Sequence, residues 1–277
     1  MDVFKTKFLT ITFVVCIFFY ANAQNNDSIN KSKATKIFLS QPNFSMYKDN
    51  YFITGTAFKE NPTINNSDAK FQISFKYRID EKPVFDNVYA YLTYTQKSFW
   101  DIYQKSSPFG DINFNPGIGL IKPYMNKKGR LGYYSIMLEH ESNGKDSIYS
   151  RSWNFISLNW SAEINSRLLI ETKAVIPFSY KTDNPDLFKY IGYGDIGFTY
   201  IFFPQKLYAK IILKKGTSWD WKGSIETQLF FKPVQSSNLY IMLQGFHGYG
   251  ENLLEYNKEV NMMRIGIVIK PTFMNFF

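Results

Sequence analysis

Cysteine and long apolar stretches are both scarce in this chain. Cys16 is its only cysteine, so no disulfide can form within one chain and the fold has to hold without cross-links. After residue 20 no run of about 20 apolar residues follows, which excludes a later helix that spans a membrane. If the chain crosses a membrane beyond its first residues, it must do so with strands.

The first residues have the pattern of a secretory signal peptide. Two lysines precede an apolar run over 8–20, which ends in the sequence Ala21-Asn22-Ala23. We predict a signal peptide over 1–23 that is cleaved after Ala23. An uncleaved membrane anchor is the less favoured alternative, because the run is short for a helix that crosses a bilayer.

Aromatic residues are abundant: Phe, Tyr and Trp make up 19% of the chain, although its mean hydropathy is negative. This combination is typical of a membrane β-barrel, which has an apolar outside, a polar lumen and aromatic girdles at both interfaces. A soluble β-sandwich is usually smaller and less aromatic. The formal net charge of +9 is a weak indication of anionic lipid or lipopolysaccharide nearby, and a nucleic-acid partner is not expected for an exported barrel.

Apolar and polar residues alternate with the period of a β-strand from residue 50 onward. Phe71, Ile73, Phe75 and Tyr77, for example, interleave with polar residues, as lipid-facing and lumen-facing positions do in a barrel. We predict an all-β fold, an antiparallel transmembrane β-barrel of about 12 strands over 50–277. The expected strands are 50–58, 70–79, 88–100, 115–125, 131–142, 152–164, 168–180, 195–205, 206–216, 223–234, 238–250 and 261–273.

Connection lengths predict which end of the barrel faces outward, because periplasmic turns are short and external loops are longer in such barrels. We expect 24–49 to be a loose N-terminal periplasmic segment, with some local order around 37–39. The terminal Phe277, on an apolar-facing strand, is similar to the recognition signal of outer-membrane barrels. The chain is therefore expected in the outer membrane. The expected external loops are 59–69, 101–114, 143–151, 181–194, 217–222 and 251–260.

Polar residues interrupt one apolar face of the predicted hairpin over 131–164. His140 and Ser142 end the apolar face of its first strand, and if the hairpin is symmetric about Ser147, His140 lies opposite Asn154. A hydroxyl, an imidazole and an amide then meet on a face turned toward lipid, at the level of the outer leaflet. These are the groups of a serine hydrolase. Without the serine and the asparagine, His140 would be interpreted as a rim histidine without chemistry.

The same residues carry a family resemblance. The string His140-Glu141-Ser142-Asn143-Gly144, followed by the sequence Ser-Arg-Ser-Trp-Asn over 150–154, closely resembles the active-site signature of the outer membrane phospholipase A family. Further matches are Tyr94-Thr95-Gln96-Lys97-Ser98, Ser106-Ser107-Pro108-Phe109 and Gly248-Tyr249-Gly250-Glu251. Together they cover most of the predicted barrel.

The resemblance implies an activity and a role for each matched residue. It implies a calcium-dependent phospholipase of A1/A2 type that hydrolyses acyl ester bonds of membrane phospholipids and lysophospholipids as a homodimer. Ser142 would be the nucleophile, His140 the general base and later the general acid, and Asn154 the residue that orients the imidazole. The backbone amide of Gly144 would stabilise the oxyanion, where glycine lets the backbone approach closely.

The resemblance also implies a Ca²⁺ site. Its ligands would be the Ser150 side chain, the Lys145 carbonyl and the carbonyl of Ser106 from the partner subunit, all hard oxygen donors that suit calcium. This sequence departs from the family pattern, because Lys145 replaces an arginine and Glu141 replaces a glutamine. A shift of the loop acid by one position leaves open whether a second calcium site exists.

Gln96 supports a homodimer on separate grounds. It shares the lipid-facing parity of Leu92 and Tyr94, and an unpaired amide there is costly. An amide of a second copy across a two-fold axis would satisfy it. The alternative is that Gln96 lies near the membrane surface and reaches toward water.

A second function from another class is a passive barrel, either a small pore or a structural protein with a decayed active site. Intact Ser142, His140 and Asn154 favour the enzyme, since a decayed site would be expected to have lost at least one of them.

Overall fold

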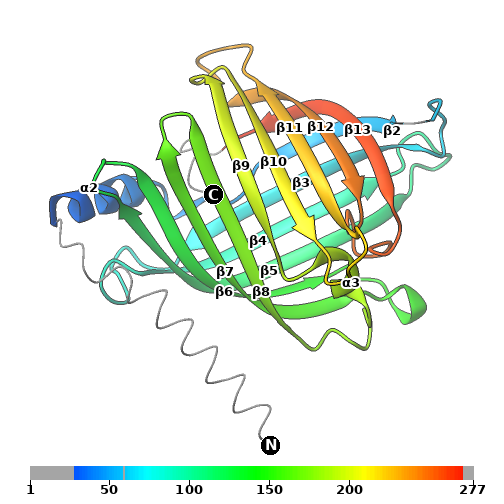
Figure 1. Ribbon diagram of the computed structural model, residues 1–277, viewed down its shortest axis with the longest axis horizontal. Coiled ribbons are helices and arrows are strands. Elements are labelled where there is room, and N and C mark those ends of the chain that lie inside the picture. The colour runs from blue at the N-terminus through cyan, green and yellow to red at the C-terminus, as the bar shows by residue number, and fades with distance from the viewer. Residues whose placement is uncertain (1–27, 59, 271–277) are drawn as a thin grey trace, which may run out of the picture.

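The computed structural model describes residues 28–58 and 60–270, and its strands close into one antiparallel barrel (Figure 1). Pairing of the last strand with the first closes the ring. The prediction of an all-β antiparallel barrel of about 12 strands is confirmed. The barrel strands are β2 (Asn50–Ala57), β3 (Ser67–Arg78), β4 (Tyr89–Trp100), β5 (Phe109–Met125), β6 (Leu131–Ser142), β7 (Ser152–Asn165), β8 (Leu168–Phe178), β9 (Gly194–Phe203), β10 (Leu207–Lys215), β11 (Gly223–Phe231), β12 (Leu239–Gly248) and β13 (Val260–Ile269).

Alternation along each strand separates the wall into two chemically different faces. On β3, Ile73 and Tyr77 are 48% and 44% exposed, whereas Lys70 and Ser74 are almost fully buried. Successive strand side chains point to opposite faces, so the apolar set covers the outside and the polar set fills the lumen. The predicted signal peptide over 1–23 and the terminal Phe277 lie outside the described residues. Among the helices of the described part, none is both long and apolar enough to cross a membrane.

Strand β5 begins earlier than expected. The sequence predicted a loop over 101–114, but the strand starts at Phe109. Polar Asp111 and Asn113 point inward on this added part and are 2% and 4% exposed, with the Asn113 amide donating to Asp111 at 2.6 Å. The polar composition that indicated a loop is therefore that of a lumen-facing strand end.

The N-terminal segment is more ordered than the loose segment with some local order around 37–39 that the sequence predicted. It contains helix α2 (Ser28–Leu39) and the short strand β1 (Phe44–Met46), which pairs with β3. Phe38 lies 5.4 Å from the ring of Tyr89 and 5.9 Å from that of Tyr91, within a buried cluster of inward-facing residues. The Arg78 guanidinium donates to the Phe38 carbonyl at 3.3 Å. This segment therefore packs onto and into one end of the barrel.

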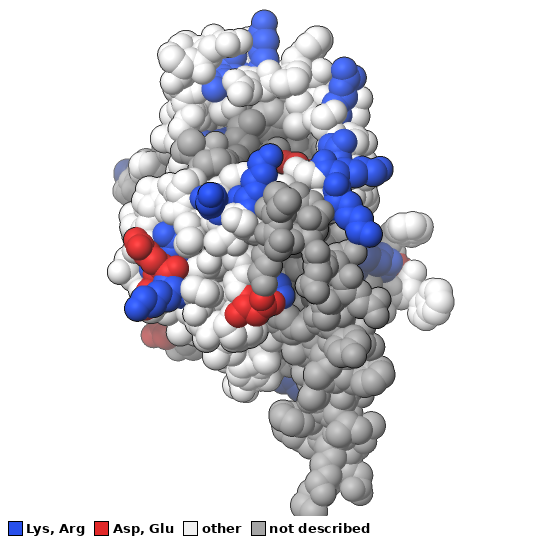
Figure 2. All heavy atoms as spheres, turned by 90° about the vertical axis from the view of Figure 1, so that its left-hand side faces the viewer, with Lys and Arg blue, Asp and Glu red and all other residues white. Residues whose placement is uncertain are grey.

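Helix α2 and the short helix α3 (Leu187–Ile191) lie at opposite ends of the barrel (Figure 1). The end with α2 carries many Lys and Arg side chains and few acidic ones (Figure 2). At least part of the net positive charge is therefore located at the end away from the loop that contains α3. The loop end carries the 3-10 turn η1 (Ser147–Tyr149), which belongs to the connection between β6 and β7.

Candidate active site

The register between β6 and β7 brings the predicted imidazole and amide together. His140 is paired directly with Asn154, and the imidazole Nδ1 lies 2.9 Å from the amide Oδ1. A cross-strand pair in an antiparallel ladder holds two side chains on the same face and within reach of each other. The contact that was expected from hairpin symmetry is thus present.

These residues lie on the outer wall. On the same face of β6, Leu138 is 50% exposed, whereas inward-facing Glu139 is 4% exposed. Ser142 follows His140 on the outer face and is paired with Ser152 of β7. Within the described residues no hydrogen bond joins the Ser142 hydroxyl to the imidazole. The structure therefore forms the His–Asn contact and leaves the serine two positions further along the same face.

A proline next to the site changes how β5 supports it. The pairing of β5 with β6 is interrupted between Phe114, which pairs with Ser142, and Gly117. Pro116 lies in this interval and has no N–H to donate to the ladder. The Asn115 side-chain amide donates to the His140 carbonyl instead, at 3.0 Å. On the β5 side, the backbone at the histidine is therefore held by a side chain, while β7 still pairs with it on the other side.

Gly144 is the second residue of the loop between β6 and β7, and its backbone conformation favours glycine. Its φ is +66°, and a Cβ at this position would lie 3.0 Å from the Phe114 ring. The left-handed conformation and the close approach both penalise any side chain here. The neighbouring Lys145 ammonium donates to the Gly110 carbonyl at 2.7 Å, which ties the loop to the start of β5.

Oxygen atoms gather at the other end of this loop. The Asp183 carboxylate accepts hydrogen bonds from the Ser152 hydroxyl at 2.7 Å and from the Ser150 hydroxyl at 3.5 Å. Sequence reasoning missed Asp183, because only the pairing of distant loops shows that it faces Ser150. Among the described residues there is no group of three His, Cys, Asp or Glu side chains that could hold a metal, so a cation site here would need hydroxyl and carbonyl oxygens in addition to the Asp183 carboxylate.

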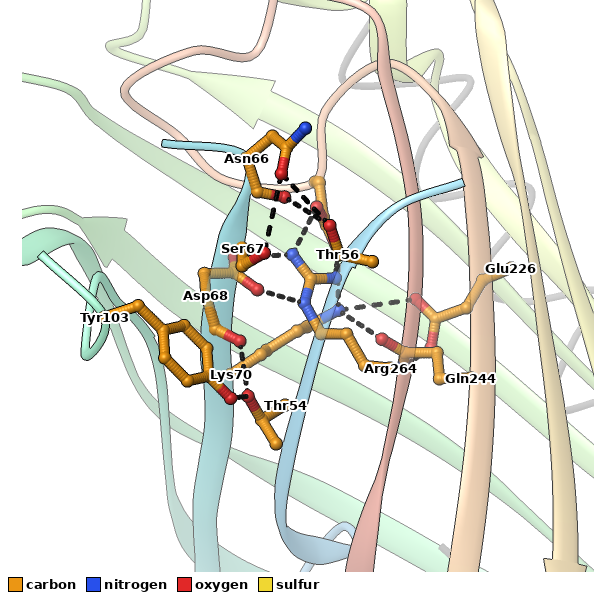
Figure 3. A network of polar contacts seen from close by, with 11 residues as sticks. Thr54, Thr56, Asn66, Ser67, Asp68, Lys70, Tyr103, Glu226, Gln244 and Arg264 are labelled. Atoms are coloured by element: carbon orange, nitrogen blue, oxygen red, sulfur yellow. Dashed lines mark hydrogen bonds and ion pairs between the residues drawn. The ribbon is translucent and has the colours of Figure 1, made fainter. Parts of the chain in front are cut away.

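Ser106 lies in the loop between β4 and β5 and is exposed, with a φ of +67°. Several hydrogen bonds fasten this loop within its own chain. The Trp100 indole donates to the Ser107 carbonyl at 2.8 Å, and the Tyr103 hydroxyl lies 2.7 Å from that of Thr54 (Figure 3). Within the described chain no bond joins Ser106 to the loop of Ser150.

Gln96 has partners on its own strand. Its amide oxygen accepts a hydrogen bond from the Tyr94 hydroxyl at 3.0 Å, and its amide nitrogen donates to the Ser98 hydroxyl at 3.1 Å. A second subunit is thus not required to satisfy this amide. Its place at a dimer interface stays a prediction.

The fold and the site define a transmembrane-type β-barrel with a histidine–asparagine pair on its outer wall. A family model described as Phospholipase A1 matches residues 21–269. The putative phospholipase A1 of Neisseria meningitidis serogroup B is 34% identical over 212 residues, covering 73% of this chain and 54% of that protein. The phospholipase A1 of Salmonella typhimurium is 30% identical over 213 residues, covering 74% of this chain and 71% of that protein. The chain belongs to the phospholipase A1 family.

Solved structures agree with this assignment. The Salmonella typhi outer membrane phospholipase, solved as a dimer with bound calcium, is 25% identical with a TM-score of 0.75 over 86% of this chain and 97% of that one. Outer membrane phospholipase A from Escherichia coli has a TM-score of 0.73 at 24% identity, over 86% and 97% of the two chains, which shows the shared fold. The chain is a β-barrel of the outer-membrane type, as predicted. It spans about half the length of the Neisseria relative.

Proposed function

We propose that this protein is a calcium-dependent outer-membrane phospholipase that hydrolyses acyl ester bonds of phospholipids and lysophospholipids, with A1 and A2 activity. The observation that carries the proposal is the 2.9 Å contact between His140 and Asn154, with Ser142 on the same outer face. A soluble substrate has no access to an apolar wall inside a membrane, whereas a lipid ester lies against it. The fold and the family membership agree with this substrate class.

Each residue of the trio has a distinct task. The Asn154 oxygen accepts the Nδ1 proton of His140, which keeps Nε2 unprotonated and available as a base. His140 then takes the proton of the Ser142 hydroxyl as the oxygen attacks the ester carbonyl, and returns it to the leaving alcohol. An amide in the third position orients the ring without placing a carboxylate charge on a lipid-facing wall, where desolvation is expensive.

The oxyanion formed in this step needs a donor. The backbone amide of Gly144 lies two residues beyond Ser142, and Gly144 has a positive φ that sets the direction of the loop. A donor that is already oriented stabilises the developing charge without reorganising, and loss of one such donor typically costs about 10²- to 10³-fold in kcat. Gly144 is therefore assigned this role.

Calcium would be held by the Ser150 hydroxyl, the Lys145 carbonyl and the carbonyl of Ser106 of the partner subunit. The donor chemistry fits, because hard oxygen ligands suit this ion, and the Asp183 carboxylate beside Ser150 adds the negative charge that the hydroxyl and carbonyl groups lack. When bound, the ion would polarise water toward the oxyanion. A ligand from the second subunit makes a homodimer the complete form, with Gln96 proposed at its interface and the site turned toward the outer leaflet.

The test is hydrolysis of a phospholipid in detergent micelles by Ser142→Ala, compared with the unsubstituted protein. Ser237→Ala, in a turn at the other end of the barrel, is the matched control. We expect Ser142→Ala to lose activity while its barrel folds as the control does. Activity retained by Ser142→Ala would overturn the proposal. Absence of hydrolysis in the unsubstituted protein, with ion conductance in planar bilayers, would favour the passive barrel.

A further inference from the structure

Asp111 lies within the predicted external loop 101–114, but in the folded barrel it is one of the most buried charges. It is 2% exposed, and within the described residues it has no ion-pair partner. Three N–H groups donate to it instead: the Asn113 amide at 2.6 Å, the Asn143 amide at 3.3 Å and the Leu254 backbone at 3.0 Å. A buried carboxylate without a cation is costly, and these three bonds offset that cost.

Asn143 lies between Ser142 and Gly144 and uses all of its hydrogen-bonding capacity on Asp111 of β5 and on the backbone of its own loop. Its amide nitrogen donates to Asp111 and, at 2.9 Å, to the Tyr149 carbonyl. Its amide oxygen accepts from the backbone N–H of Lys145 at 3.3 Å and of Arg151 at 3.0 Å. Because donors and acceptors are fixed on opposite sides, the amide cannot be turned over without breaking every bond. One buried side chain thus holds both ends of the loop.

The third partner of Asp111 belongs to the loop between β12 and β13, residues 249–259. Leu253 of this loop donates to the Asn113 side chain at 3.2 Å and is itself 5% exposed. The loop is fastened inside the lumen by Glu251, which bonds the Arg264 guanidinium at 2.6 Å and the Lys70 ammonium at 3.1 Å. Figure 3 shows Lys70 and Arg264 side by side in this network. The loop is therefore a fixed support for Asp111.

We propose that Asp111 and Asn143 are positioning residues that transmit this support to the reacting groups. The anchored loop 249–259 fixes Asp111, Asp111 fixes the Asn143 amide, and Asn143 sets the backbone of Gly144. The inference rests on the proposed function, since it assigns a task to residues behind the proposed oxyanion donor. Neither side chain touches substrate, because both are buried behind the outer wall.

Asp111→Asn tests the link at nearly constant volume. The new amide keeps one oxygen for Asn113 and Leu254 but presents N–H groups to Asn143, whose own N–H groups already point that way. Asn143 cannot turn over, so this one bond is lost and the loop shifts. Small misplacements at a reacting centre cost on the order of 10²-fold, so we expect kcat to fall roughly 10- to 100-fold. We expect KM to stay within about twofold, since the lipid-contacting wall is unchanged.

Combining Asp111→Asn with Asn143→Asp provides a rescue. The exchanged pair restores one donor facing one acceptor, while the oxygen at position 143 still accepts from Lys145 and Arg151. We expect the double variant to recover part of the lost kcat, up to roughly tenfold relative to Asp111→Asn. The rescue is partial because an oxygen at position 143 then faces the Tyr149 carbonyl, where the Asn143 amide now donates. If the two residues only stabilised the fold, the substitution would lower the unfolding midpoint. It would not lower kcat selectively while leaving KM nearly unchanged. Asp80→Asn, in an exposed turn at the other end, is the control.

The measurement is kcat and KM for phospholipid hydrolysis in calcium-containing micelles, on variants whose folded barrel is verified by circular dichroism. A tenfold or larger loss of kcat in Asp111→Asn, with partial rescue in the double variant, supports the inference. Control-like kcat in Asp111→Asn overturns it and leaves the proposed function standing, and so does a double variant no better than Asp111→Asn. An inactive unsubstituted protein overturns the proposed function and this inference with it.

Discussion

Replacing Glu251 by glutamine removes a carboxylate that bridges two buried cations. Its oxygens lie 2.6 and 3.3 Å from the Arg264 guanidinium and 3.1 Å from the Lys70 ammonium. All three residues are at most 5% exposed. Glu251→Gln keeps the size of the side chain but removes the negative charge that pairs with both cations. Removing one partner of a buried ion pair typically costs about 3–5 kcal/mol.

The pKa of Glu251 indicates a similar loss of stability. Burial alone would raise this pKa, but the charges of Arg264 and Lys70 outweigh burial and lower it from 4.5 to about 2. Such a shift corresponds to about 3 kcal/mol of stability. Because the folded-state pKa lies below the ordinary value, this stabilisation is fully present above pH 4.5 and is lost as the pH falls toward 2 and below.

The assay is urea unfolding in detergent micelles, followed by tryptophan fluorescence at pH 7 and at pH 3. We expect Glu251→Gln to lower the free energy of unfolding by about 3 kcal/mol at pH 7, and by less than half of that at pH 3. Glu255→Gln, in the same loop but in an exposed pair with Lys258, should change it by less than about 0.5 kcal/mol. A Glu251→Gln variant as stable as Glu255→Gln at both pH values would refute the reasoning.

Three further predictions concern the site and the N-terminal segment. Gly144→Ala should lower kcat at least roughly tenfold, because a Cβ at a φ of +66° forces the proposed oxyanion amide to move; steady-state kinetics that match the unsubstituted protein would contradict this. Asp183→Asn should raise the calcium concentration needed for half-maximal activity, measured by calcium titration, since it removes the carboxylate beside Ser150; an unchanged titration curve would exclude Asp183 from the site. Phe38→Ala should cost about 3 kcal/mol in urea unfolding, because it empties a buried contact with Tyr89 and Tyr91; a loss below about 1 kcal/mol would show that α2 is only loosely attached.

The parts of the fold that follow from periodicity were predictable from the sequence. Strand alternation is a local property, so the strands around Ile73 or Leu138 and the pairing of His140 with Asn154 follow from the order of residues alone. The three residues of the proposed triad also lie in a specific motif, which is why the sequence is sufficient to locate the candidate site.

Properties that depend on contacts between distant segments were not predictable in this way. Asp111 and Asp183 have the sequence context of ordinary loop acids, and only the folded barrel shows that the first is buried and that the second faces Ser150. Helix α2 has no amphipathic pattern of its own, and its attachment depends on Phe38 meeting rings that come later in the chain. In each case tertiary placement decided the outcome and the local sequence did not.

The central claim is that a serine, a histidine and an asparagine on the outer wall hydrolyse lipid esters with calcium. The most direct measurement is the release of fatty acid from a phospholipid in detergent micelles by the refolded protein, first with calcium and then with excess chelator. We predict hydrolysis with calcium and its loss with chelator. Hydrolysis that persists with chelator would contradict the calcium site, and the absence of hydrolysis in both conditions would contradict the enzyme.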